Sequence, residues 1–499
     1  MSAHLPILPV LLPLLAGILL LALSDMDIRI QRRVNLIATG LLVLLAGWLV
    51  VLTAEIPFHV YALGDWRPPF GIVLVVDRLS AIMLAATALL ALAVTGYVYA
   101  KDDYHGDNFY ALFQFQLLGL NGAFLTGDLF NLFVFFEILL ISSYALLVYG
   151  AGRERVMAGL HYVVINLVGS AFFLIAVGTL YALLGTLNIA DLARSMVDLP
   201  ASDQALARAA GLLLLVVFAI KAALLPLGFW LPAAYGSAAA PVAALFAIMT
   251  KVGVYGILRV HGTLFGEQAG ELAGLGNTLL WWLGLATLLL SMIAVLAGRH
   301  LRGVLVWLVI FSVGVMMTGI AQADVQVLTA VLYYLLHSTW VIAALFLLAG
   351  CVVAWRGDAA DYYVVGLRPG KRLGLLFMVG AVAVIGLPPL SGFVSKVLLL
   401  QAVGAGWAML PLWVLLLVGG LLTLVALSRA GSSLFWRGEA GEPLRRLPVW
   451  PVALLLLASI VMAFAAAPVL DYLEGAAQQI LHPVGYIDAV LGSEVRDAN

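Results

Sequence analysis

The stretch LFNLFVFFEILLISSYALLVYG, residues 129–150, is an apolar run long enough to cross a bilayer as a helix, and it carries one carboxylate, Glu137. A charge near mid-membrane costs roughly 2.5–3.5 kcal/mol on insertion scales, so such a residue normally faces the interior of a helix bundle and has a partner or a transport function. Residues 129–150 therefore predict both a membrane-spanning helix and a buried functional group.

The composition of the whole chain agrees with a membrane location. Of its 499 residues, 64% are hydrophobic and only 10% are charged, which is typical of an integral membrane protein built as one helical domain. The formal net charge of −1 and the lack of a basic tract with interleaved aromatic residues argue against a nucleic-acid partner. Cys351 is the single cysteine, so neither an intrachain disulfide nor a cysteine-based metal cluster is expected.

A membrane-length window predicts an all-α integral membrane protein of about 14 transmembrane helices. The apolar segments lie near residues 5–24, 34–53, 79–100, 109–126, 130–149, 161–185, 209–230, 237–260, 277–298, 303–321, 327–351, 373–402, 407–427 and 450–470. The first is expected to be retained as a helix, because MSAH before it lacks the basic residues of a secretion signal.

Basic residues predict the orientation, because Lys and Arg collect in cytoplasmic loops. Most of the 25 basic residues fall in alternate loops that become cytoplasmic if the N-terminus lies outside; Lys101, Arg445 and Arg446 are among them, whereas Arg259 and Arg496 fall on the outer side. We therefore expect a multi-pass protein with both termini outside the cytoplasm.

Three lysines, Lys221, Lys251 and Lys396, lie inside apolar segments, as Glu137 does. A single buried lysine can staple helices together or extend its ammonium to the membrane surface. Four such charges in one chain favour a polar pathway through the bundle.

Two of these lysines lie beside helix breakers, in KAALLPLGFWLP (residues 221–232) and GLPPLSGFVSK (residues 386–396). Proline removes an intrahelical hydrogen bond and clashes with the preceding turn, so both helices should be interrupted within the membrane. Freed carbonyls are tolerated there only inside protein or beside a wet cavity. A pair of interrupted helices in two halves is typical of a transporter with inverted repeats.

Four segments also carry a family resemblance: GDLFNLFVFFEILLISSYALL, HYVVINLVGSAFFLIAVGTLYALLGTLNIADLA, SAAAPVAALFAIMTKVGVYGILR and GLPPLSGFVSK. They resemble the D-type protein of the Mrp-type multisubunit cation/proton antiporter, which is related to the antiporter-like membrane subunits of respiratory complex I. The resemblance implies two inverted five-helix repeats, with helices 7 and 12 broken. It divides the chain into helices 1–3 (1–108), the first repeat (109–261), the second repeat (262–430), and helix 14 with a tail (431–499).

The resemblance also implies a proton and ion pathway. It places the family's charged residues at Glu137 on helix 5, Lys221 on helix 7, Lys251 on helix 8 and Lys396 on broken helix 12. The histidine of helix 11 corresponds to His337. One turn further on, where many relatives carry a lysine, this chain has Val341 and Ile342. The implied setting is a bacterial cell membrane, with other Mrp subunits as partners and protons and Na⁺ as the transported ions.

The residues support proton handling on physical grounds as well. Burial disfavours the charged forms of a carboxylate and a lysine, whereas their mutual attraction favours both charged forms. At a separation of about 7 Å and an effective dielectric of about 20 the attraction is about 2.4 kcal/mol, enough to decide whether a lysine keeps its proton. The hypothesis is that Glu137 holds Lys221 charged until Lys221 moves toward Lys251, which drives a proton on toward His337 and Lys396.

The other polar residues are weaker candidates. His4, His105, His261, His300 and His482 are expected in loops or at membrane edges, and His161 at the start of helix 6 is ambiguous. Asp128 is expected to cap helix 5. Phosphate-binding glycine loops, zinc-ligand spacings and nucleophile–base pairs are lacking, so no cofactor, metal or enzymatic activity is expected.

Two functions remain open beside a passive scaffold. The favoured one is the proton-translocating subunit of a Na⁺/H⁺ antiporter. The alternative is a proton-pumping membrane-arm subunit of an NADH dehydrogenase, in which the same charges would be driven by redox chemistry elsewhere. The C-terminal residues 471–499 are expected along the outer surface or against a partner.

Overall fold

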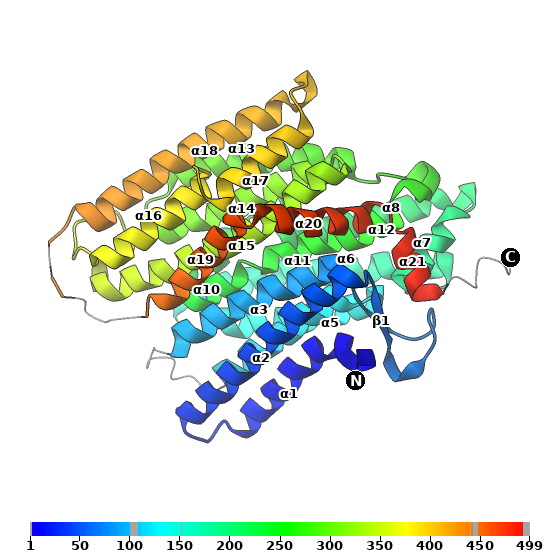
Figure 1. Cartoon of the computed structure of the whole chain (residues 1–499), viewed down its shortest axis with the longest axis horizontal. Coiled ribbons are helices and arrows are strands. Elements are labelled where there is room, and N and C mark those ends of the chain that lie inside the picture. The colour runs from blue at the N-terminus through cyan, green and yellow to red at the C-terminus, as the bar shows by residue number, and fades with distance from the viewer. Residues whose placement is uncertain (1, 100–107, 151, 440, 443–447, 493–499) are drawn as a thin grey trace.

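The computed structural model describes residues 2–99, 108–150, 152–439, 441–442 and 448–492 (Figure 1). Five residues used in the predictions lie outside the described residues: Lys101, His105, Arg445, Arg446 and Arg496.

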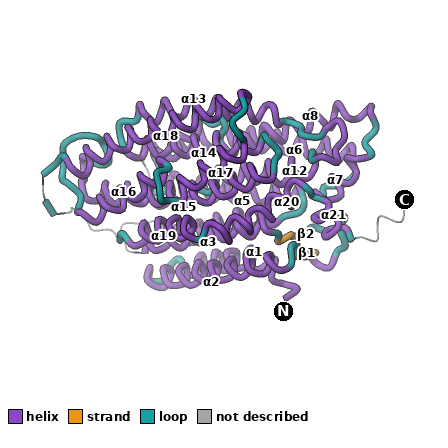
Figure 2. Tube along the Cα trace, turned by 45° about the horizontal axis from the view of Figure 1, so that its top comes forward, coloured by secondary structure: helices purple, strands orange, loops and turns teal. Residues whose placement is uncertain are grey.

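Long apolar helices make up most of the described chain (Figure 2). Eleven are long and apolar enough to cross a membrane: His4–Ala22 (the end of η1 with α1), α2 Ile28–Glu55, α3 Arg78–Tyr99, α5 Leu129–Val148, α6 Arg153–Leu184, α8 Ala201–Ala222, Ala240–Leu264 (α10, α11, η3 and α12), α13 Asn277–Ala297, α14 Leu301–Ile320, α15 Val325–Arg356 with η5, and α18 Leu410–Gly431 with η6 and η7. The bent pair α19 Trp450–Phe464 and α20 Ala466–Leu481 could make a twelfth. Two shorter apolar helices are α4 Phe109–Leu125 and α17 Ser391–Val403.

The helix interrupted after Lys221 is broken where the prolines predict. α8 ends at Ala222, and α9 Trp230–Ser237 begins after seven non-helical residues. The second predicted break separates α16 Lys371–Ile385 from α17, which begins at Ser391. Each break contains a cis proline peptide bond, at Pro226 and at Pro389.

A short β-hairpin is an exception to the helical architecture. Strand β1, His59–Ala62, pairs antiparallel with β2, Val73–Val76, with His59 opposite Val76. All four residues of β2 are buried. The hairpin packs against η1 at the start of the chain and against α21, Val484–Leu491, near its end. Both ends of the described chain therefore lie at one end of the molecule, toward the right in Figure 1.

The C-terminal region differs from its predicted course. The last long apolar helix, α19, ends at Phe464, six residues before the end of the predicted segment, and α20 follows it at an angle of 87°. α20 packs against α15 and α3 and buries Leu473, Ala476, Ala477 and Ile480. The prediction for residues from 471 onward, along the outer surface or against a partner, stays a prediction, because α20 packs one face onto its own chain and leaves residues such as Asp471 and Gln478 exposed.

α15 is the central helix of the bundle. It packs against α14, α17, α19 and α20, and nearly all of its residues between Val327 and Val352 are buried. This helix carries His337, so the predicted histidine of the pathway lies at the centre of the protein.

Candidate functional site

Glu137 and Lys221 lie together at the first helix break. The Ser170 hydroxyl on α6 donates a hydrogen bond to the Glu137 carboxylate, which is half-buried on α5. Lys221 is the second-to-last residue of α8 and is 8% exposed. Its ammonium lies 5.0 Å from the centre of the Phe136 ring. The negative charge of Glu137 attracts it electrostatically. Among the described residues, no hydrogen-bond acceptor reaches Lys221 Nζ.

Lys251 lies deeper than the other lysines. Its side chain is 0% exposed on α11, Met249–Gly256. Nζ donates to Ser312 Oγ on α14 at 3.0 Å and lies 3.4 Å from Thr250 Oγ1. Ser312 Oγ in turn donates to the Val309 carbonyl at 2.6 Å. Lys251 thus joins the helix after the first break to α14.

His337 points from α15 toward the second break. Its Nδ1 lies 2.8 Å from Ser391 Oγ, at the first residue of α17, and Ser391 Oγ lies 2.5 Å from Ser459 Oγ on α19. His337 and Ser459 are almost fully buried. A chain of one imidazole and two hydroxyls therefore connects three helices, and hydroxyls both donate and accept, so such a chain can pass a proton.

Lys396 folds back onto the break that precedes it. Its Nζ donates to the Ile385 carbonyl at 2.7 Å and lies 3.4 Å from the Val384 carbonyl. Both carbonyls belong to the last turn of α16, where the helix leaves them without an intrahelical partner. Lys396 as a whole residue is half-buried.

The five predicted residues therefore form three groups. Glu137 and Lys221 are one, Lys251 with its serine is the second, and His337 with Lys396 is the third. No hydrogen bond links these groups directly within the described part of the chain. Met249 and Val252, on the helix of Lys251, line the space around Lys221, so the first two groups adjoin.

Sequence reasoning missed the serines that contact these charges: Ser170, Ser312, Ser391 and Ser459. Serine is common in membrane helices, so its presence in an apolar segment singles out no site. Only Ser391, directly after the proline pair and Leu390, carried a local signal.

A large open cavity of about 1000 Å³ lies at the first break. Arg153, Arg155, His161, Phe229, His300 and Arg302 are among the residues that line it. Arg302 Nη2 pairs with Asp361 Oδ1 at 3.0 Å, and the Arg155 guanidinium donates to the carbonyls of Tyr149 and Ser237. Partial burial lowers the pKa of His300 below the ordinary histidine value, against the attraction of Asp361, so His300 is neutral at pH 7.

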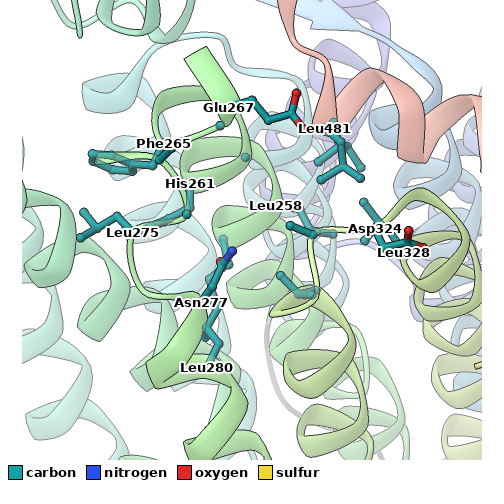
Figure 3. A pocket seen from close by; sticks show the side chains of 18 of the residues that line it. Leu258, His261, Phe265, Glu267, Leu275, Asn277, Leu280, Asp324, Leu328 and Leu481 are labelled. Atoms are coloured by element: carbon teal, nitrogen blue, oxygen red, sulfur yellow. The ribbon is translucent and has the colours of Figure 1, made fainter. Parts of the chain in front are cut away.

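A second cavity of about 340 Å³ lies beyond the C-terminal end of the helix that carries Lys251 (Figure 3). Leu258, His261 and Phe265 meet Asn277, Asp324 and Leu328 around it. None of the five predicted pathway residues lines it. His261 was expected at a loop or membrane edge, but it is 7% exposed within the π-helical turn η3, Ile257–His261, and its Nε2 lies 3.0 Å from the Gly211 carbonyl.

The same π-helical turn holds a buried ion pair. Arg259 Nη2 lies 2.7 Å from Asp77 Oδ2, and the two side chains are 6% and 2% exposed. Arg259 Nε also donates to Tyr255 Oη at 3.0 Å. The loop charges assign Arg259 to an outer helix end, but its contacts make it a structural link between η3 and the start of α3.

The predicted cap of helix 5 is confirmed. Asp128 is the N-cap of α5, and its Oδ1 accepts from the Asn131 amide at 2.7 Å. Metal-ligand clusters of three or more His, Cys, Asp or Glu are absent from the described residues.

Buried charges beside two interrupted helices are typical of membrane transport proteins, and comparison with known proteins gives the family of this chain. The model of the NADH:quinone oxidoreductase/Mrp antiporter transmembrane family matches residues 126–423, so the chain belongs to that family. Within it, the chain is similar to the D-type protein of a probable K⁺/H⁺ antiporter from Rhizobium meliloti (strain 1021), at 38% identity over 98% of each chain. It is also 36% identical to the D-type protein of the Na⁺/H⁺ antiporter from Bacillus subtilis (strain 168), over 97% of this chain and 99% of that one.

Solved structures agree with this assignment. A chain of the Mrp complex from Dietzia sp. DQ12-45-1b matches with a TM-score of 0.87 and 27% identity, over 98% of this chain and 99% of that one. A chain of the archaeal membrane-bound sulfane sulfur reductase, a respiratory membrane complex, matches with a TM-score of 0.90 and 25% identity, over 97% and 99%.

Proposed function

We propose that this chain is the proton-translocating, D-type component of a multisubunit antiporter that exchanges a monovalent cation for protons. It is part of a transporter rather than an enzyme. Its similarity to the D-type antiporter proteins extends over nearly the whole chain and supports the class of function. The buried charges at the helix breaks carry the proposal for how protons move.

In this proposal Glu137 and Lys221 form the switch of the pathway. The Glu137 carboxylate, held by Ser170, stabilises the charged form of Lys221. Because Lys221 Nζ has no hydrogen-bond partner among the described residues, its long side chain can swing with little loss of bonding. Movement toward Lys251 would bring two like charges together and drive a proton away along the polar groups.

The later part of the pathway uses the groups at the second break. A proton displaced near Lys251 would pass toward His337, whose imidazole meets the hydroxyls of Ser391 and Ser459. Lys396 is the end of the pathway, because it is half-buried and its ammonium is held by freed carbonyls. The exchanged cation in this proposal is Na⁺; the two curated relatives are named for different cations.

The proposed membrane topology has fourteen crossings. To the eleven long helices and the bent α19–α20 pair it adds α4, which is 17 residues long, and the interrupted α16–α17. Helices α4–α12 and α13–α18 would form the two inverted repeats. The shared location of both chain ends supports an even number of crossings, and the loop charges place those ends outside a bacterial cytoplasm.

Partner subunits would complete the pathway. Glu137, at one end of the pathway, is only half-buried in this chain. An ionised group near mid-membrane needs protein or water around it, so a neighbouring subunit should cover this position. The solved relatives belong to Mrp and respiratory membrane complexes, which supports a multisubunit setting.

Alanine variants of Glu137 and Lys221 test the pathway. In the assembled complex each should lower cation-dependent dissipation of a pH gradient in vesicles by at least about tenfold, equivalent to about 1.4 kcal/mol or more in the transport barrier. Glu271→Ala, which removes an exposed carboxylate, is the matched control. Assembly is checked by co-purification of the other subunits. Wild-type exchange in assembled Glu137→Ala would refute the proposed switch.

The alternative function is a proton-pumping component of a respiratory complex. The observation in its favour is the TM-score of 0.90 with one polypeptide of an archaeal respiratory membrane complex. The two functions differ in what drives the protons. Exchange driven by a Na⁺ gradient in vesicles without an electron donor supports the antiporter, whereas proton movement that requires an electron donor supports the respiratory complex.

A further inference from the structure

Two spaces of very different size lie on either side of the first helix break. One is the open cavity of about 1000 Å³, lined by His161 and Phe229 among others. The other is a closed space of about 10 Å³ around Lys221, lined also by Tyr162 and Trp230. About 10 Å³ is room for about one water molecule, so this space is too small to hold a file of waters at Lys221.

One pair of aromatic rings lines the small space, and the residues next to them in the chain line the open cavity. His161 and Tyr162 are consecutive on α6, and Phe229 and Trp230 are consecutive at the start of α9. In each pair the first residue lines the open cavity and the second lines the closed space. Tyr162 and Trp230 stack with their ring centres 4.9 Å apart and their planes 29° from parallel. We call these two side chains the aromatic pair.

Hydrogen bonds hold the aromatic pair in place. Tyr162 Oη lies 2.9 Å from Ser143 Oγ on α5, and Trp230 Nε1 donates to the Ile220 carbonyl at 3.1 Å. Both rings are almost fully buried. Ile220 precedes Lys221, so the bond from Trp230 ends on the turn of α8 that carries the lysine.

The carbonyls beside the two helix breaks have different side-chain partners. At the second break the lysine ammonium itself binds the last-turn carbonyls of α16. At the first break the Ile220 carbonyl accepts from the Ala223 amide and from Trp230 Nε1, and Lys221 Nζ has no hydrogen-bond partner within the described residues. Trp230 therefore both lines the space around Lys221 and bonds the turn of α8 that carries this lysine.

We propose that Tyr162 and Trp230 form a gate between the open cavity and Lys221, and that the hydrogen bond from Trp230 to Ile220 links opening of the gate to movement of the lysine. When the end of α8 shifts, this bond breaks, Trp230 leaves Tyr162, and water from the open cavity reaches Lys221. The inference rests on the proposed role of Lys221 in proton movement. It adds a positioning residue, Trp230, that controls when Lys221 exchanges protons with one side of the membrane.

Cysteine accessibility tests the gate without measuring transport. Cys351, the single cysteine, is replaced by serine, and Met249→Cys places a thiol in the closed space. The charged thiol reagent methanethiosulfonate ethyltrimethylammonium is then applied to vesicles of both orientations that contain the assembled complex. With Trp230 present the thiol should stay protected. With Trp230→Ala its modification from the side of the open cavity should be at least about tenfold faster, because a buried site reacts in proportion to its opening.

Trp340→Ala is the matched control variant. Trp340 also donates from Nε1 to a backbone carbonyl, that of Ala86, at 3.2 Å, and it lines neither space. In this variant the thiol at position 249 should remain protected. Equal modification rates with and without Trp230, or acceleration by Trp340→Ala as large as by Trp230→Ala, would overturn the gate.

The variant Trp230→Phe distinguishes two properties of Trp230: its ring contact with Tyr162 and its hydrogen bond to the Ile220 carbonyl of α8. Phenylalanine retains a ring against Tyr162 but has no N–H for the Ile220 carbonyl, so the thiol should stay protected while cation/proton exchange slows severalfold. Exchange at the wild-type rate would overturn the link. If Lys221→Ala exchanges normally while the labelling results hold, the gate remains and the proposed role of Lys221 fails, so the two ideas fail separately.

Discussion

Single side chains divide into those a sequence reveals and those it does not. Glu137, Lys221 and Lys251 stand out because a charge in an apolar run is costly and rare. Their serine partners do not stand out, because a hydroxyl can bond to its own helix and needs no partner elsewhere. The Thr318 hydroxyl on α14 donates a hydrogen bond to the Gly314 carbonyl of its own helix. The Ser312 hydroxyl on the same helix also accepts a hydrogen bond from the Lys251 ammonium. Only the packed helices distinguish these two hydroxyls.

Ser312→Ala should slow exchange, because the Lys251 ammonium loses its closest acceptor in a fully buried site. A hydrogen bond to a charged group contributes about 1.5–3 kcal/mol, so a drop of roughly tenfold or more in the exchange rate of vesicles is expected. Thr318→Ala removes a hydroxyl from the same helix without touching a charge and should leave the rate within about twofold. Equal rates in the two variants would show that Ser312 does not support Lys251.

Helix interruptions were predictable where proline and charge occur together. The proline-rich stretches after Lys221 and before Lys396 mark both broken helices correctly. The bend between α19 and α20 was missed, although Pro468 in the first turn of α20 carries the same type of signal. An apolar window averages over such a bend, because the segments on both sides are hydrophobic. The π-helical turn at Ile257–His261 has no proline and could not be predicted from pattern.

The ion pair between this π-helical turn and α3 should be important for stability. Removing one member of a buried pair leaves an uncompensated charge, so Asp77→Ala and Arg259→Met should each destabilise the chain by about 3–5 kcal/mol. The double variant should lose less unfolding free energy than the two single variants lose together, because neither charge is then left without its partner. Thermal unfolding in detergent measures all three. Additive losses would mean that Asp77 and Arg259 do not depend on each other.

The arrangement of helices across the membrane was predictable in outline. Hydropathy and loop charges predict a bundle whose two ends lie together, and the contacts of η1, β1 and α21 agree. The β-hairpin and the packing of α20 into the bundle could not be predicted, because short strands and small-residue contacts leave weak patterns. The serine contacts of Glu137, Lys251 and His337 join residues that are distant in sequence, so they too required the folded chain.

Membrane orientation has a direct test. In the Cys351→Ser background, Asp25→Cys lies in the turn between α1 and α2, and Glu267→Cys lies in the segment between α12 and α13. With both chain ends outside, an impermeant thiol reagent added to intact cells should modify position 267 and spare position 25. In inverted vesicles the result should be the opposite. Modification of both positions from the same side would refute the fourteen-crossing topology.

The partial exposure of Glu137 also bears on biosynthesis. A copy made without its neighbours would place this carboxylate against hydrocarbon, which costs roughly 2.5–3.5 kcal/mol near mid-membrane. Orphan copies should therefore be recognised and degraded faster than assembled ones. Cells that make this chain would then need matched synthesis of its neighbours, and its steady-state abundance would report how much complete complex the membrane holds.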